Sequence, residues 1–302
     1  MSDTAQIYDQ GYRRYEGERT GLTGAVRTLI THSIRHALGI GRSAKFKTIP
    51  VLVIIFAYLP AVAFVGLAAL LPEDLVAEGV LPTYAGYYSY VVGAIYLFAA
   101  FVAPLLLCTD RRTGMLGVYL ASPLNRVTYL LGKALATLIL LLIVTLGPPL
   151  LMLVAFSLES VGPAGFIEWI RVFLQIVVSS LVIGLLFSSV SLAVAAATDR
   201  WVVATAAAVL IMPGSAILTD ALVYGAGLTD TLHLLNIPNM PRELIYRIHD
   251  EARAGSGSPL GDASLWTERE VSTWSLWASW CVYMTATIGF IWFRYRKLLV
   301  RR

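Results

Sequence analysis

Six long apolar runs dominate this sequence, and they limit what the chain can fold into. An α-helix rises about 1.5 Å per residue, so ~20 residues cross a hydrocarbon core roughly 30 Å thick. The runs lie at residues 50–71, 87–108, 134–158, 170–197, 201–224 and 273–293. We therefore expect an all-α integral membrane protein with six transmembrane helices.

Composition supports this expectation and excludes a typical water-soluble domain. Of the 302 residues, 57% are hydrophobic and 14% are charged, whereas soluble domains average roughly 45–50% and about 25%. A single helical membrane domain occupies residues 49–293 and leaves little chain for a catalytic domain. Any second activity must come from a partner.

The distribution of Lys and Arg predicts the orientation. Eight of them lie between Arg13 and Lys47, and the 294–302 tail is basic, whereas residues 72–86 contain acids and no Lys or Arg. Basic loops stay in the cytoplasm, so we expect cytoplasmic termini and an outer loop at residues 225–272. The net charge of +4 thus reflects membrane topology and gives no reason to expect a nucleic-acid partner.

The N-terminal segment, residues 1–48, contains an amphipathic pattern. From Leu22 to Leu38, apolar residues recur at helical spacing, with Arg27 and Arg35 towards the opposite side. Such a helix fits the inner membrane surface, where arginines face anionic headgroups. A helix docked on a soluble partner would have the same pattern.

The predicted spans hold almost no ionisable residue away from their ends. Arg171, Asp199 and Asp220 lie at span boundaries. Proton- and sodium-coupled carriers usually place Asp, Glu or His at membrane depth, so this pattern favours an energy source outside the chain.

The outer loop contains a second short amphipathic pattern. Asn239 is a plausible N-cap, and the residues that follow predict a helix to about Ala252. Its candidate lid or gate residues are Pro241, Leu244, Ile245 and Ile248.

The connection at residues 109–133 has the most informative pattern. It begins with polar residues, turns at Gly114, continues as a short amphipathic piece and breaks at Ser122 and Pro123. Such an element can lie at the membrane surface and present one side to a soluble partner. An inner loop with no such role would also contain arginines.

This connection resembles that of the permeases of type 2 ABC transporters. The matching positions are Asp110, Arg111, Gly114, Leu116, the Ser122–Pro123 pair, and Gly132 with Lys133. Met115 and Gly117 stand where the family usually has Thr and Glu, so this chain lacks the family's glutamate carboxylate at position 117. The six spans, inside termini and long outer loop are also similar to the family.

The resemblance implies a pair of permeases, identical or related, above two ATP-binding-cassette ATPase subunits in a bacterial inner membrane, in contact with membrane lipids. Residues 109–133 would form the coupling segment, and the exported substrate would be amphiphilic, lipid-linked or drug-like. ATP and magnesium would sit on the partner, and this chain would bind no cofactor. The candidate coupling residues are Asp110, Arg111, Arg112, Gly114, Leu116, Ser122, Pro123 and Arg126.

No catalytic or metal-binding motif is recognisable in the sequence. A phosphate loop ends in GK[ST], but Gly132 and Lys133 are followed by Ala134, with Val127 where the first glycine belongs. Four scattered histidines and two cysteines lack the spacing of a metal site.

Two other functions stay open. Acids of the outer loop, such as Asp250 and Glu251, could serve an enzyme acting on lipids at the outer face. The chain could also be a subunit that relays ATPase motion without transporting anything.

Overall fold

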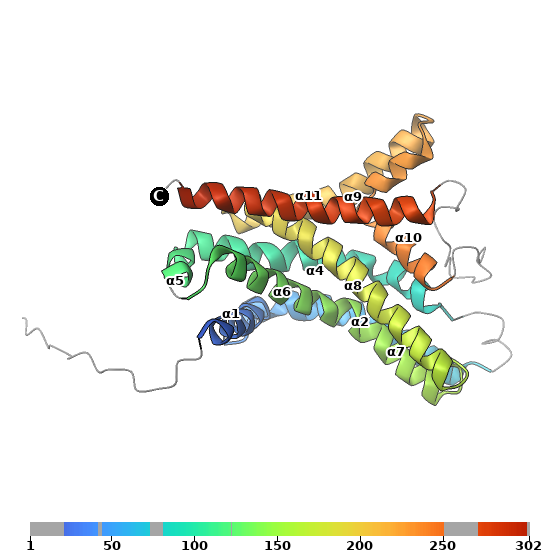
Figure 1. The fold of residues 1–302 in the computed structure, drawn as a ribbon. Coiled ribbons are helices and arrows are strands. Elements are labelled where there is room, and N and C mark those ends of the chain that lie inside the picture. The colour runs from blue at the N-terminus through green and yellow to red at the C-terminus, as the bar shows by residue number, and fades with distance from the viewer. Residues whose placement is uncertain (1–20, 42–43, 73–80, 122, 251–270, 301–302) are drawn as a thin grey trace, which may run out of the picture.

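The computed structural model describes residues 21–41, 44–72, 81–121, 123–250 and 271–300. These residues form an all-helical bundle (Figure 1). The helices are α1 (Gly21–Ala37), α2 (Ala44–Leu70), α4 (Tyr84–Arg112), α5 (Met115–Ala121), α6 (Arg126–Thr145), α7 (Gly147–Leu158), α8 (Phe166–Ala197), α9 (Trp201–Asp220), the π-helix η1 (Ala221–Gly225), the 3-10 helix η2 (Asp230–Leu235), α10 (Asn239–Ile248) and α11 (Thr273–Val300).

Six helical segments among the described residues are long and apolar enough to cross a membrane, in agreement with the sequence prediction. They are Lys47–Leu70, Tyr84–Arg112, Arg126–Leu158, Phe166–Ala197, Trp201–Gly225 and Thr273–Lys297. The third begins eight residues before the predicted start at 134. The Asn125 side chain accepts from the Thr128 amide and the Thr128 hydroxyl oxygen accepts from the Asn125 amide, and this capping box starts the helix early.

The third span bends where α6 passes into α7. Pro149 has no N–H for the carbonyl of Thr145, four residues earlier. That carbonyl instead accepts a hydrogen bond of 3.2 Å from the Tyr88 hydroxyl of α4, and the Ser180 hydroxyl of α8 lies 3.1 Å from it. The bend is therefore fixed by side chains of two neighbouring helices.

The central helix of the bundle is α8, which packs against α4, α6 and α11. Its small residues face these neighbours: Ser179, Ser180 and Gly184 are all buried. A Cβ atom on Gly184 would lie 3.3 Å from a Leu138 methyl group. The small residues thus allow close helix packing within this chain.

The predicted amphipathic N-terminal helix is α1, and its buried face lies on the bundle. Leu29, Ser33 and Ala37 are buried, and Leu29 packs so closely on α6 that a Cβ at Gly132 would come within 2.8 Å of it. Arg27 and Arg35 are exposed. The bundle of the same chain therefore covers one side of α1.

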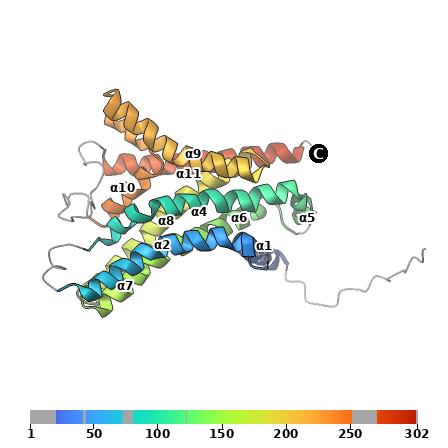
Figure 2. The same cartoon turned by 180° about the vertical axis from the view of Figure 1, so that it is seen from behind.

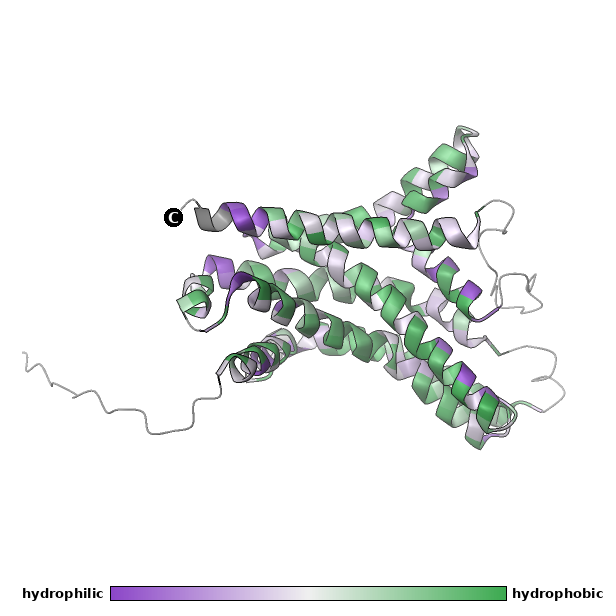
Figure 3. Cartoon of the chain, viewed as in Figure 1, coloured by the Kyte–Doolittle hydropathy of each residue, from purple (hydrophilic) through white to green (hydrophobic). Residues whose placement is uncertain are grey.

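The bundle has two distinct ends, which we name after their short helices. The α5 end also carries α1 and the C-terminal part of α11, whereas α10 lies at the opposite, α10 end; both views agree on this arrangement (Figures 1 and 2). At the α10 end, α9 diverges from α7 and α8. Apolar residues cover the middle of the bundle, and hydrophilic residues gather at the α5 end of α4 and α11 (Figure 3).

Candidate functional site

The candidate coupling segment, residues 109–133, forms a turn, a short helix and the start of the next span. After α4 ends, Gly114 adopts a φ of +74°, a conformation that glycine adopts without strain. α5 follows and projects beyond the spans at its end of the bundle (Figure 1). The 109–133 segment is therefore mainly helical, with α5 between two turns.

One side of α5 contacts its own chain and the other is exposed. Leu116 and Tyr119 are half-buried, whereas Val118 is 62% exposed and Met115 is 40% exposed. Exposed apolar residues on a helix outside the spans suit a protein partner.

An ion pair beneath α5 joins α4 to α6. The Lys133 ammonium nitrogen lies 2.7 Å from an Asp110 carboxylate oxygen, and the two side chains are 2% and 13% exposed. The same oxygen accepts a hydrogen bond of 2.9 Å from the Tyr129 hydroxyl. The charge of Lys133 is thus compensated inside the bundle, as a buried cation requires.

Aromatic rings surround this pair. The Lys133 nitrogen lies 5.7 Å from the ring centre of Tyr119 and 5.8 Å from that of Tyr129, within cation–π range. Tyr129 also lies 6.2 Å from the ring of Tyr295 in α11. We call Asp110, Lys133, Tyr119, Tyr129 and Tyr295 the polar lock.

The polar lock connects α5 to three spans. Tyr119 belongs to α5, Asp110 to α4, Tyr129 and Lys133 to α6, and Tyr295 to α11. Burial, aided by the negative charge of Asp110, raises the pKa of the Tyr119 hydroxyl above its ordinary value, which keeps it protonated. Since these side chains contact one another, a displacement of α5 would also displace α4, α6 and α11.

The fourth span is fastened to the same end by arginines. Arg111 donates to the carbonyl oxygens of Ala195 and Ala196 at 3.3 and 3.0 Å, and Arg294 of α11 donates to that of Ala197 at 3.0 Å. These carbonyls lie in the last turn of α8, where the helix itself offers no donor and cations are favoured.

The other predicted coupling residues lie at the surface of the α5 end. Arg112, Pro123 and Arg126 are exposed, and Ser122 lies outside the described residues. Arg112 lines a hollow of about 410 Å³ together with Asp199 and Arg200 of the α8–α9 turn. The structure therefore separates exposed residues, able to meet a partner, from Asp110 and Arg111, which contact neighbouring helices.

The sequence prediction missed several residues of this site. Lys133 was a motif position without an assigned role, Tyr119 was only one residue of the short amphipathic piece, and Tyr129 and Tyr295 were given no role. A lysine seven residues into an apolar helix is the one signal that could have suggested a buried ion pair, because such a charge needs a partner.

At the α10 end, the predicted lid residues form the inner face of α10. Pro241, Leu244 and Ile245 are buried and Ile248 is half-buried against a layer formed by α4, α8 and α11. The helix ends at Ile248 instead of about Ala252. It begins at Asn239, whose amide donates to the Asn236 side chain, so Asn236 provides the capping oxygen expected from Asn239.

Hydrogen bonds fasten α10 at both ends. The Ile237 amide, just before the helix, donates to the Ser215 hydroxyl of α9 at 3.1 Å. Gln175 of α8 donates to the Ile248 carbonyl at 2.9 Å. The helix is therefore held across the top of the bundle between two spans.

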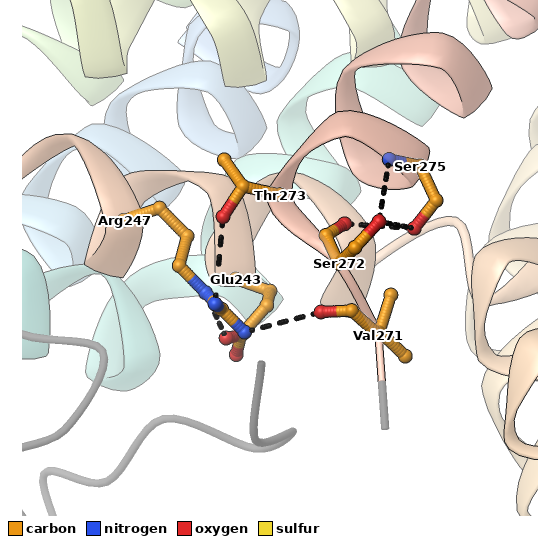
Figure 4. A network of polar contacts seen from close by, with 6 residues as sticks. All are labelled: Glu243, Arg247, Val271, Ser272, Thr273 and Ser275. Carbon is orange, nitrogen blue, oxygen red and sulfur yellow. Dashed lines mark hydrogen bonds and ion pairs between the residues drawn. The ribbon is translucent and has the colours of Figure 1, made fainter. Parts of the chain in front are cut away.

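A buried ion pair within α10 contacts the start of α11 through its arginine (Figure 4). Arg247 donates to the Glu243 carboxylate at 3.0 Å, and their side chains are 4% and 0% exposed. The guanidinium also reaches the Val271 carbonyl at 3.4 Å and the Thr273 hydroxyl at 3.5 Å. We call Glu243 and Arg247 the α10 clasp.

His249 makes the stability of the α10 end depend on pH. Burial lowers its pKa from 6.5 to about 4, although the nearby charge of Asp250 opposes this shift. The unfolded chain therefore takes up a proton between pH 6.5 and 4 that the folded chain does not, and stability is lost as the pH falls through this window. We expect a loss of about 3 kcal/mol.

Thermal unfolding in detergent between pH 7.5 and 4 would measure this loss. His249→Gln should remove most of the pH dependence, whereas His32→Gln, at an exposed position of α1, should leave it unchanged. An identical pH profile for His249→Gln and the wild type would contradict the assignment.

Within the described part of the chain, no group of three His, Cys, Asp or Glu side chains gathers in a way that could hold a metal ion. The features of the site are structural: the partly exposed helix α5, the polar lock beneath it, and α10, which the α10 clasp holds at the opposite end.

No curated protein matched the chain. The family profile described as ABC-2 family transporter protein matches residues 5–298, which is nearly the whole length. Together with six helices able to span a membrane, this match shows that the chain is a multi-pass membrane protein that belongs to the ABC-2 transporter family, whose permeases associate with ABC ATPase subunits.

Proposed function

We propose that this chain is the permease of an ATP-driven exporter in a bacterial inner membrane. Two copies, or this chain and a related permease, would stand above two ATPase subunits. ATP and magnesium would bind those subunits. The substrate class that best fits spans without unpaired buried charge is an amphiphilic, lipid-linked or drug-like molecule.

The single observation that carries this proposal is the connection of α5 to the spans through the polar lock. Met115 and Val118 of α5 are exposed, while the ring of Tyr119 contacts the ammonium group of the buried Lys133. A push on α5 by an ATPase subunit would therefore move α4, α6 and α11 together, since packed interiors transmit displacement.

The arginines would share two tasks. Arg112 and Arg126 are exposed and suited to meet acidic side chains of an ATPase subunit. Arg111, in contrast, would extend the movement to α8, because it holds the final carbonyls of that helix.

The lid would act at the other end. In alternating access, closure of the ATPase subunits would move the α5 end, and α10 would leave its position over α4, α8 and α11 to open an outward path. The hydrogen bond that Ser215 accepts from Ile237 and the one that Gln175 donates to Ile248 are the contacts that must break or move with it.

Gly114→Val is the direct test of the coupling segment. A β-branched residue at φ +74° is strained by about 1–2 kcal/mol or more, which should displace α5. We expect transport per ATP hydrolysed to fall by about tenfold, the equivalent of 1.4 kcal/mol, while the spans stay folded.

The control is Gly165→Val. Gly165 has a similar φ of +89° and open space around it, but lies in the α7–α8 turn at the far end. Co-purification of an ATPase subunit from the native host, followed by ATPase and transport assays, would supply both readouts. Equal coupling in the two variants would remove the coupling role of α5, and repeated purification of the chain alone would favour the lipid-enzyme alternative.

A further inference from the structure

A groove of about 240 Å³ opens between α6 and α11 near the α5 end of the bundle. In both views α4 and α8 lie between these two helices (Figures 1 and 2). Its lining includes Val127 and Leu131 on the α6 wall, Ile288 and Trp292 on the α11 wall, and Leu107 and Leu192 on the floor.

Burial shows which way the groove opens. The floor residues Leu107 and Leu192 are 0% and 5% exposed, whereas Leu131 and Ile288 on the walls are both 55% exposed. All of these residues belong to segments able to span the membrane. The groove therefore faces the bilayer, where hydrocarbon is the surrounding medium.

Charge is arranged in two layers along the groove. Inside, Lys133 contributes to the lining, but its ammonium is compensated by Asp110. At the α5 end, Arg126 directly precedes the wall residue Val127, and Arg296 follows Trp292 by one helical turn; both arginines are exposed. An apolar interior below a basic rim is complementary to an acyl chain that carries an anionic headgroup.

We propose that this groove binds one acyl chain of an anionic phospholipid from the leaflet at the α5 end, with the headgroup beside Arg126 and Arg296. Leu107 of the floor belongs to α4 and one wall belongs to α6, and these two helices are joined by the Asp110–Lys133 pair. A bound lipid therefore sits against the polar lock. The inference rests on the membrane placement of the spans and not on the identity of any ATPase partner.

Trp292 supplies the measurement. The protein would be placed in nanodiscs that contain increasing fractions of phospholipid with brominated acyl chains, which quench tryptophan at contact. The signal of Trp292 is the difference between the wild type and Trp292→Phe. We expect brominated phosphatidylglycerol to quench this signal at a fraction about thirtyfold lower than brominated phosphatidylcholine, since each of the two arginines near the surface contributes about 1 kcal/mol.

Two variants make the result specific to the groove. Adding Phe290→Trp to Trp292→Phe moves the indole to a nearby exposed residue of α11 that does not line the groove, and this tryptophan should not prefer phosphatidylglycerol. Arg126→Gln with Arg296→Gln should abolish the preference while quenching persists.

Equal quenching of Trp292 by both lipids, or the same preference at position 290, would overturn the proposal. A preference that survives removal of both arginines would overturn the headgroup assignment. The assay needs no ATP and no transport, so its outcome is independent of the Gly114→Val test.

Discussion

Replacing Asp110 with asparagine is expected to destabilise the protein by about 3–5 kcal/mol, because it leaves a buried cation without its counter-charge. Lys133 is 2% exposed and its nitrogen lies 2.7 Å from the carboxylate that the substitution removes. The Tyr129 hydroxyl would also lose a charged acceptor. Thermal unfolding of the purified protein in detergent would measure the change.

A second substitution separates lost charge balance from lost packing. Lys133→Met in the Asp110→Asn background removes the buried cation and keeps an unbranched apolar side chain, so stability should recover by several kcal/mol. Asp199→Asn, at an exposed aspartate of the α8–α9 turn, is the matched control and should change stability little. An Asp110→Asn protein as stable as the Asp199→Asn protein would contradict the buried pair.

The same double variant also tests the polar lock as a coupling element. If the ion pair only stabilises the fold, Asp110→Asn with Lys133→Met should regain transport together with stability. If it also positions α5, the double variant should be stable and still hydrolyse ATP without proportional transport. The ratio of transport to ATP hydrolysis distinguishes these outcomes, and a restored ratio would reject the positioning role.

Glu243→Gln is expected to have the second large effect. It should lower the free energy of unfolding by about 3 kcal/mol, because Arg247 would remain buried with a neutral partner. The Val271 and Thr273 oxygens would still contact the guanidinium, but neither carries a compensating charge. Hydrogen exchange of α10 should therefore rise, and a cysteine at Ile245 should become accessible to thiol reagents.

An exposed ion pair at the same end provides the comparison. Arg171 and Asp250 lie 2.6 Å apart with side chains 65% and 69% exposed, and such pairs contribute about 0–1 kcal/mol. Asp250→Asn should therefore leave α10 protected. Equal exchange of α10 in the Glu243→Gln and Asp250→Asn proteins would show that the clasp does not hold the helix.

The spans were predictable because hydropathy depends on local composition alone. The start of the third span was misplaced for a physical reason: Arg126 and Lys133 lower local hydropathy, so the pattern places them in a loop. In the structure, Arg126 is exposed at the first helical position and Lys133 is neutralised by a partner 23 residues earlier. A one-dimensional pattern does not contain that pairing.

The candidate site was predictable only in part for the same reason. Gly114 was identified from its type and position, because a glycine between two helical patterns indicates a turn. The roles of Arg111 and Tyr295 depend on where the ends of α8 and α11 lie, and those ends approach α4 and α6, respectively, only in the folded bundle. The amphipathic pattern of α1 likewise does not say what its apolar face packs against. The contact between Leu29 and Gly132 of α6, which shows this, exists only in the folded chain.

The Asp110–Lys133 pair has a consequence for how the chain enters the membrane during synthesis. A lysine near the middle of an inserting helix carries a penalty of roughly 2.5–3.5 kcal/mol, and snorkelling lessens it near the ends. Lys133 lies inside the third span, and its partner arrives earlier, at the end of the second. We therefore expect the second and third spans to leave the translocation channel together, as a helical hairpin in which Asp110 and Lys133 are already paired. These two spans would thus be inserted as a unit and not one after the other.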